Sequence, residues 1–248
     1  MKAYYFLSGL PRSGNTLLGA IINQNPKINL TSNTILTDVL YQLLLIKDYE
    51  IYKNFPDEKS LNNIIKNTFN NYYKDWKANS IIDRGVWGTP SNLKLLKLII
   101  KKPKFIILYR PVLECLASFI KIEKPVNLES RCHELMKDDG MIGKSLWSVK
   151  NIIKEKEDHI IINYSDLVSN PLKEINKIYF YLNIDSFKHK LKDFNIFSAN
   201  NIKYEDSVLL FDLHTIRTNK IKQNHYKVED YLPTNIIKQY SNLDIWRY

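Results

Sequence analysis

The stretch YYFLSGLPRSGNTLL, residues 4–18, decides the fold of this chain. The apolar run Tyr4–Leu7 is typical of a buried strand, and a tight loop between Gly9 and Gly14 follows it. Apolar residues then recur at helical spacing: Leu17, Leu18, Ile21 and Ile22. Because the first backbone N–H groups of a helix have no partner within the helix, a strand, a tight loop and a helix in this order predict a cradle for an anion.

This loop differs from a nucleoside-triphosphate loop in one residue. Gly9, Gly14 and Thr16 keep the spacing of G-x-x-x-x-G-K-[ST], but Asn15 stands where the lysine is expected. A kinase or NTPase would also need a strand that ends in aspartate to hold Mg²⁺, whereas the clearest strand, KFIILYR, ends in Arg110. The loop therefore predicts an anion site without a metal.

Strand-like and helix-like segments alternate along the rest of the chain. We expect strands at residues 4–7, 80–85, 104–110 and 159–167, and helices near residues 35–44, 60–77, 91–101, 112–120, 129–156 and after Pro171. This alternation predicts a P-loop-like α/β fold of three layers, with a central parallel sheet of about five strands, helical insertions, and a ligand site beyond the carboxyl ends of the strands. No repeat or low-complexity linker marks a boundary, so we expect residues 1–248 to form one domain.

Composition limits the classes of function. The formal charge of +10 favours an anionic partner, but lysine, asparagine and isoleucine are abundant throughout, so we expect no nucleic-acid partner. Cys115 and Cys132 lack the spacing of a zinc site or a disulfide framework. A strand that begins at Tyr4 leaves no room for a leader peptide, and no apolar run is long enough to span a bilayer. We therefore expect a cytoplasmic protein without a metal.

Acidic residues are missing from the two segments that we expect to bind anions. The first carboxylate is Asp38, and none occurs between Asp212 and Glu229. The second segment carries Arg217, Lys220, Lys222 and Lys227. A sulfuryl group carries less negative charge than a phosphoryl group, so arginine, lysine and backbone donors are enough to assist its transfer.

Several motifs resemble the sulfotransferase family, which uses 3′-phosphoadenosine 5′-phosphosulfate (PAPS) as donor. GLPRSGNTLL resembles the family's loop for the 5′-phosphosulfate, and RPVLECLASF resembles its signature for the 3′-phosphate. YSDLVSNPLKEINKIYFYLNI is similar to a third family segment, and LHTIRTNKIK to the tail of bacterial and viral members. The resemblance implies the following donor-binding residues: Arg12, Ser13, Gly14, Asn15, Thr16, Leu17, Arg110, Ser118, Tyr164, Arg217, Lys220 and Lys222.

The resemblance also implies a mechanism. The acceptor hydroxyl or amine attacks sulfur in line, a general base removes its proton, and adenosine 3′,5′-bisphosphate (PAP) leaves, while Arg12 stabilises the developing charge. Many members place the base soon after the first helix, but KINLTSNTIL at that place has no carboxylate. Asp38, Asp83 and His214 are equal candidates for the base. Arg84 corresponds to the basic residue that some members use at the bridging oxygen.

Two other classes of function remain open from the sequence. One is a P-loop kinase or NTPase that has lost its lysine, for which only the segment SIID offers a strand ending in aspartate. The other is a binding module without catalysis, either a nucleic-acid binder or a sulfotransferase homologue that lacks a base. The sequence leaves the acceptor open among a peptide tyrosine, a sugar hydroxyl, a lipid and a small phenol. We expect its pocket to come from residues 30–79 and from parts of residues 122–145 and 185–212.

Overall fold

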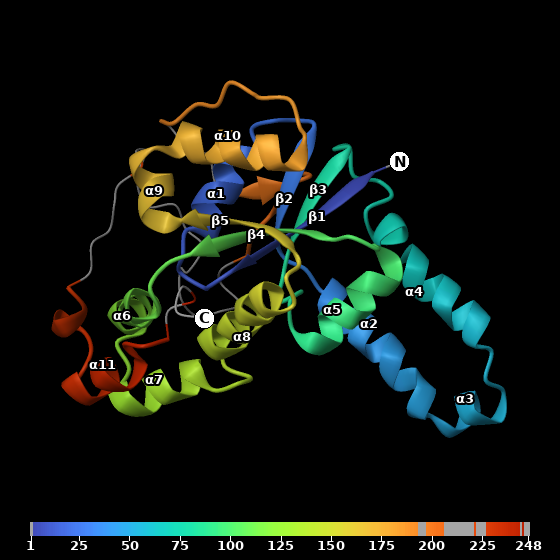
Figure 1. Cartoon of the computed structure of the whole chain (residues 1–248), viewed down its shortest axis with the longest axis horizontal. Coiled ribbons are helices and arrows are strands. Elements are labelled where there is room, and N and C mark those ends of the chain that lie inside the picture. The colour runs from blue at the N-terminus through green and yellow to red at the C-terminus, as the bar shows by residue number, and fades with distance from the viewer. Residues whose placement is uncertain (1, 193–196, 206–220, 222–226, 244, 246–248) are drawn as a thin grey trace.

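The computed structural model describes residues 2–192, 197–205, 221, 227–243 and 245. Its centre is a parallel sheet of five strands in the order β2-β3-β1-β4-β5 (Figure 1). The strands are β1 (Ala3–Gly9), β2 (Ile28–Asn33), β3 (Ser80–Arg84), β4 (Lys104–Tyr109) and β5 (Asp158–Asn163). The predicted fold class is therefore confirmed, and β1, with the loop that follows it, lies at the middle of the sheet.

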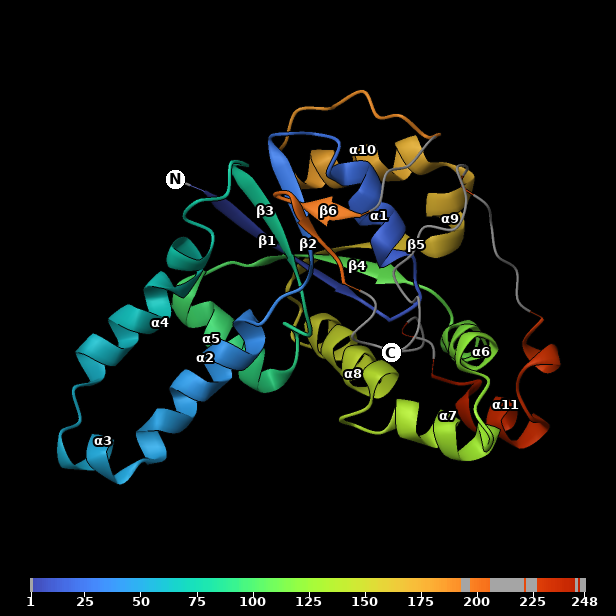
Figure 2. The same ribbon diagram turned by 180° about the vertical axis from the view of Figure 1, so that it is seen from behind.

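Helices cover both faces of this sheet (Figures 1 and 2). One face carries α1 (Asn15–Ile22), α9 (Tyr164–Ser169) and α10 (Pro171–Leu182). The other face carries α2 (Leu36–Leu45), α4 (Glu58–Tyr72), α5 (Pro90–Ile99), α6 (Val112–Glu123) and α8 (Met141–Lys154). Smaller elements are the 3₁₀ turns η1 (Ile46–Asp48) and η3 (Val228–Asp230), the helices α3 (Glu50–Asn54), α7 (Leu128–Met136) and α11 (Thr234–Tyr240), and a two-stranded ribbon of β6 (Ser198–Ala199) and β7 (Ile202–Lys203).

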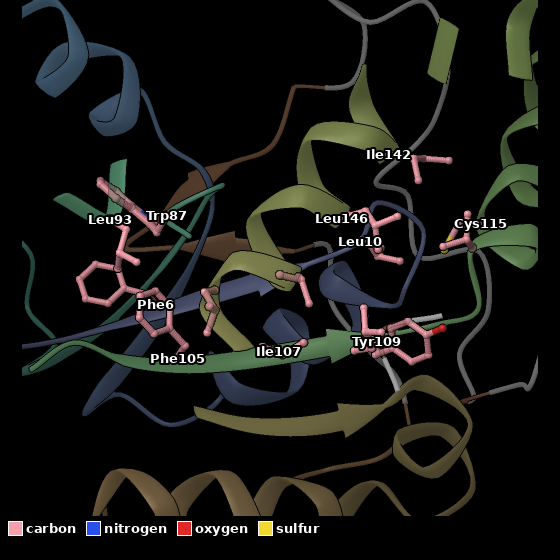
Figure 3. Close-up of a cluster of buried hydrophobic side chains, with 14 of the residues drawn as sticks. Phe6, Leu10, Trp87, Leu93, Phe105, Ile107, Tyr109, Cys115, Ile142 and Leu146 are labelled. Carbon is pink, nitrogen blue, oxygen red and sulfur yellow. The ribbon is translucent and has the colours of Figure 1, made fainter. Parts of the chain in front are cut away.

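Two hydrophobic cores result, one on each face. Successive side chains of a strand point to opposite faces, so Phe6 of β1 enters one core and Leu7 the other. The Phe6 ring lies 5.5 Å from the Trp87 ring and 5.8 Å from the Phe105 ring, measured between centroids (Figure 3). Full burial stabilises each such side chain by about 2 kcal/mol, which is why the central strands are apolar without interruption.

Three predictions about the elements were wrong. The strand expected over residues 159–167 ends at Asn163, because the following residues form the helix α9, which packs Leu167 into the core. The edge strand β2 was missed, because Asn29, Thr31 and Ser32 hide its apolar alternation. The single helix expected over residues 129–156 is two helices, α7 and α8, which meet at a turn before Gly140. A Cβ atom at Gly140 would lie 2.3 Å from the Glu134 carbonyl oxygen, so the chain reverses more tightly there than a side chain allows.

Helices α2, α3 and α4 form an arm that extends away from the sheet (Figures 1 and 2). Ile51 and Phe55, each 78% exposed, lie in and directly after α3. Within the described residues, no helix has the length and apolar character needed to cross a membrane. The single-domain organisation stays a prediction.

Candidate active site

The loop between β1 and α1 is fixed by its own polar groups. The Ser13 N–H and hydroxyl both donate to the Leu10 carbonyl, and so does the Asn15 side-chain amide, at 2.8 Å. Arg12 and Gly14 have φ angles of 64° and 95°, a region that costs little for glycine but strains an arginine. The loop therefore has one rigid shape that turns its backbone toward the start of α1.

Asn15, at the position of the missing lysine, is one of the residues whose hydrogen bonds fix the loop. Its side chain is 4% exposed, and its amide nitrogen also lies 3.2 Å from the Ser13 hydroxyl oxygen. A Cβ atom at Gly9 would lie 2.5 Å from the Asn15 Oδ1, so Gly9 makes room for the amide. Asn15 thus points into the loop, whereas a nucleotide-binding lysine would point out of it toward phosphate.

The backbone N–H groups at the start of α1 face the loop. The first helical hydrogen bond runs from the Leu18 N–H to the Gly14 carbonyl at 2.9 Å. Among the described residues, no backbone acceptor pairs with the N–H groups of Gly14, Asn15, Thr16 or Leu17, and the first turn holds no acidic residue. These N–H groups and the positive end of the helix dipole are the features on which the predicted anion cradle depends, and anion binding there stays a prediction.

Tyr164 closes one side of the loop. It is the first residue of α9, directly after β5, and a Cβ atom at Gly14 would lie 2.8 Å from its ring carbon Cδ2. The Arg110 guanidinium carbon lies 4.3 Å from the centre of the same ring, a cation–π contact. Tyr164 therefore connects the loop to Arg110, and only glycine fits at position 14.

The predicted 3′-phosphate pair lies next to the loop. Arg110 is 3% exposed, and it donates from Nε to Glu114 at 2.9 Å and from Nη1 to the Arg12 carbonyl at 3.1 Å. Arg12 in turn donates from Nε to the Ser118 hydroxyl at 3.2 Å. The structure thus brings Arg12, Arg110, Ser118 and Tyr164 together, as the sequence motifs predict. Glu114 was missed, although it stands four residues after Arg110, in the first turn of α6.

Arg84 adds a further cation. It ends β3, and its N–H donates to the Thr31 hydroxyl at 3.0 Å. Desolvation by the surrounding protein lowers the pKa of Arg84 to about 10; Tyr204 raises this pKa, and the charge of Arg12 lowers it further. No carboxylate of the described chain forms an ion pair with Arg84. Two partly desolvated guanidinium groups that repel each other are a suitable site for an anion.

Asp83, one of the three candidate bases, is fully buried at 0% exposure. Its carboxylate accepts hydrogen bonds from the Thr34 hydroxyl at 3.0 Å, from the Trp87 indole N–H at 2.8 Å and from the Tyr73 hydroxyl. Desolvation raises the pKa of Asp83 to about 6, against the lowering effect of these three donors. No sequence signal points to Thr34, Tyr73 or Trp87 as its partners, because they come from three different segments.

The other candidate bases lie elsewhere. Asp38 is exposed in the first turn of α2, and the adjacent Thr37 side chain lies against Gly85, the residue after Arg84. His214, Arg217, Lys220 and Lys222 lie outside the described residues. Across the described chain, no group of three or more His, Cys, Asp or Glu side chains is placed to hold a metal ion.

The parallel sheet and the loop into α1 define a P-loop-like α/β protein, with backbone N–H groups and arginine side chains gathered at the carboxyl end of β1. The model of the sulfotransferase family matches residues 5–189. This match spans most of the chain, and the protein therefore belongs to the sulfotransferase family.

Solved structures show the same fold at low sequence identity. The sulfotransferase domain from the curacin biosynthetic pathway is 16% identical, with a TM-score of 0.57 over 97% of each chain. The sulfotransferase domain of the Synechococcus PCC 7002 olefin synthase is also 16% identical, with a TM-score of 0.55 over 97% of this chain and 94% of that one. Mouse sulfotransferase SULT7A1, solved in complex with PAP, is 14% identical, with a TM-score of 0.55 over 98% of this chain and 82% of that one. No curated protein matches the sequence.

Proposed function

We propose that the protein transfers a sulfuryl group from PAPS to an acceptor hydroxyl or amine, in line and without a metal. One observation carries this proposal: the N–H groups at the start of α1 and the side chains of Arg12, Arg84 and Arg110 come from three strand ends but lie at one edge of the sheet. Sulfuryl transfer needs stabilisation of charge on oxygen, which these donors supply.

The site fits a donor that carries two anionic groups. The N–H groups of Gly14 to Leu17 suit the 5′-phosphosulfate, and Arg110 with Ser118 suits the 3′-phosphate. The two sites are joined, because Arg12 belongs to the first and bonds to residues of the second. We propose that Arg217, Lys220 and Lys222 complete the donor site.

The residues of the chain act mainly through charge and orientation. Arg12 and Arg84 stabilise the negative charge that develops around sulfur and the bridging oxygen. Preorganised donors of this kind contribute about 3 kcal/mol each to the transition state. Because the loop is braced by Ser13 and Asn15, its donors need little reorganisation during the reaction. PAPS supplies the sulfuryl group, and PAP is the leaving product.

A general base must reach the acceptor hydroxyl. Asp38 is the exposed carboxylate at the start of α2 and follows Thr37, whose side chain lies against Gly85. We propose Asp38 and His214 as candidates for the base. Asp83 is the third predicted base, but it is fully buried and its carboxylate already accepts bonds from protein groups, which favours a different role.

The rival kinase or NTPase function is not favoured, because Asn15 is used inside the loop and leaves no cation at the lysine position. A non-catalytic homologue is the remaining alternative, and turnover of PAPS with any acceptor would exclude it. The free thiols of Cys115 and Cys132 fit a reducing compartment, and we propose the cytoplasm as location and residues 1–248 as one domain.

A thermal-shift comparison of PAP, adenosine 5′-monophosphate (AMP), and ATP with Mg²⁺ tests the proposed function. At a hundredfold excess over its dissociation constant, PAP adds roughly 2.7 kcal/mol to the free energy of unfolding, which raises the Tm by about 5 to 11 °C. AMP, which lacks the 3′-phosphate, gives a smaller shift at equal concentration. Stabilisation by ATP with Mg²⁺ but not by PAP would contradict the proposal and favour the kinase or NTPase function.

A further inference from the structure

Asp83 sits where three segments of the chain meet. Thr34 lies between β2 and α2, Tyr73 directly follows α4, and Trp87 lies in the loop after β3. Each donates a hydrogen bond to the Asp83 carboxylate, and Tyr73 and Trp87 are themselves fully buried. A carboxylate that holds three donors from three segments fixes their positions relative to β3.

The same contacts keep Asp83 away from an acceptor. A general base needs an oxygen within hydrogen-bond reach of the proton that it removes. Both oxygens of Asp83 already accept bonds from protein groups, and the side chain is 0% exposed. The Asp83 carboxylate is therefore placed for support and not for proton transfer.

The supported residue is Arg84. Because side chains alternate along a strand, Arg84 points to the face opposite Asp83, toward the α1 side and Arg12. The adjoining turn is tied to β1, since the Gly85 N–H donates to the Leu7 carbonyl at 3.2 Å and the Ser8 hydroxyl to the Gly85 carbonyl at 3.3 Å. A shift of Asp83 would therefore move Arg84 relative to the loop at Arg12.

We propose that Asp83 is a positioning residue that holds Arg84 beside Arg12 and fixes the start of α2, where Asp38 lies, against the same site. This inference rests on the proposed function, because it assigns Arg84 to the group being transferred. Asp83 contacts neither donor nor acceptor. Its loss weakens binding of the transferring group and leaves binding of the nucleotide intact.

Vanadate tests this inference without a known acceptor, because it adopts the five-coordinate geometry of a group in transfer and binds as a transition-state analogue. We would measure its affinity by calorimetry on protein saturated with PAP. Asp83→Asn and Arg84→Ala are each expected to weaken vanadate binding about tenfold, while PAP affinity stays within about twofold. The vanadate affinity of the double variant is expected to stay within about threefold of that of Arg84→Ala, because both substitutions remove the same interaction.

Two further variants secure the test. Thr34→Val removes one of the three donors to Asp83, so it is expected to weaken vanadate binding about threefold, and it replaces Asp83→Asn in the cycle should that variant not fold. Glu174→Gln is the matched control, because Glu174 is also a buried carboxylate, 2% exposed and paired with Lys177 on α10. It is expected to change neither affinity.

The possible outcomes separate the two proposals. Wild-type protein that does not bind PAP overturns the proposed function and this inference with it. Wild-type protein that binds PAP but not vanadate overturns the inference alone. Wild-type vanadate affinity in Asp83→Asn would also overturn the inference. That result is expected if Asp83 is a base, because a base acts on the acceptor and not on the transferring group. If Asp83→Asn weakened vanadate binding by the same factor in the wild type and in Arg84→Ala, Asp83 would not act through Arg84.

Discussion

At the scale of single residues, Asn15 shows how one substitution changes what a loop can do. The nucleoside-triphosphate loop places a mobile cation at this position, whereas here a short amide bonds to the Leu10 carbonyl and the Ser13 hydroxyl. The loop gains rigidity and loses a charge, and Arg12 and Arg84 supply positive charge in its place. The sequence shows that the lysine is missing, but the direction of the amide follows only from the packing around Gly9.

Asn15→Ala is expected to lower the free energy of unfolding by about 1 to 3 kcal/mol, because it removes two hydrogen bonds from a buried site. Urea denaturation measures this change. Asn67→Ala is the matched control: the Asn67 amide also donates to a backbone carbonyl, that of Asn63 at 2.9 Å, but it is exposed on α4. We expect an effect within about 0.5 kcal/mol there. Equal losses of unfolding free energy at both positions would show that the Asn15 side chain does not stabilise the loop.

At the scale of elements, the sequence predicts well those segments whose pattern comes from burial. The apolar run of β4 and the proline at the start of α10 are both where they were expected. The edge strand β2 and the turn between α7 and α8 were not, because an edge strand needs no apolar alternation and the turn depends on contacts made by Gly140. In the site, the pair of Arg110 and Ser118 was implied by the resemblance of RPVLECLASF to a family signature, whereas the Asp83 partners come from distant elements that no local pattern links.

The contact of α9 with the end of β4 gives a prediction at this scale. Arg110 stacks on Tyr164 and makes two directed hydrogen bonds, which a lysine, as a point charge, cannot reproduce. Arg110→Lys is expected to weaken PAP binding about 10- to 100-fold, since each charged hydrogen bond contributes roughly 1.5 to 3 kcal/mol. AMP affinity is expected to change less than threefold.

Calorimetric titration with both nucleotides measures this selectivity. Arg131→Lys serves as control, because Arg131 is also an arginine in a two-pronged ion pair, with Glu123, away from the loop. It is expected to leave the ratio of the two affinities unchanged. If PAP and AMP affinity fell by the same factor in Arg110→Lys, the 3′-phosphate would lie elsewhere.

At the scale of the whole molecule, one buried carboxylate joins the sheet to the helical arm. Asp83 belongs to β3, and its partners Thr34 and Tyr73 flank the two long helices of the arm, α2 and α4. Desolvation raises the pKa of Asp83 to about 6, so the folded protein binds this proton more tightly than the unfolded chain does. The contribution of Asp83 to stability is thus largest near pH 4 and falls as the pH rises to about 6.

Comparison with Asp83→Asn isolates this effect, because asparagine does not titrate. The free energy of unfolding of the wild type minus that of the variant is expected to fall by about 2 kcal/mol between pH 4.5 and pH 7, at about 1.4 kcal/mol for each pH unit up to 6. Urea denaturation across this pH range measures the difference. A difference that grew with pH would mean that the fold favours the ionised carboxylate.

The burial of both cysteines has a practical consequence. Cys115 and Cys132 lie inside the core, and desolvation raises the pKa of the first to about 12 and of the second to about 11. Maleimide dyes react with the thiolate, so the native thiols are nearly inert toward them at neutral pH. A cysteine introduced at the exposed Asp57, where the arm turns into α4, would then take up the dye selectively. The natural chain is ready for fluorescence labelling without any prior removal of its own cysteines.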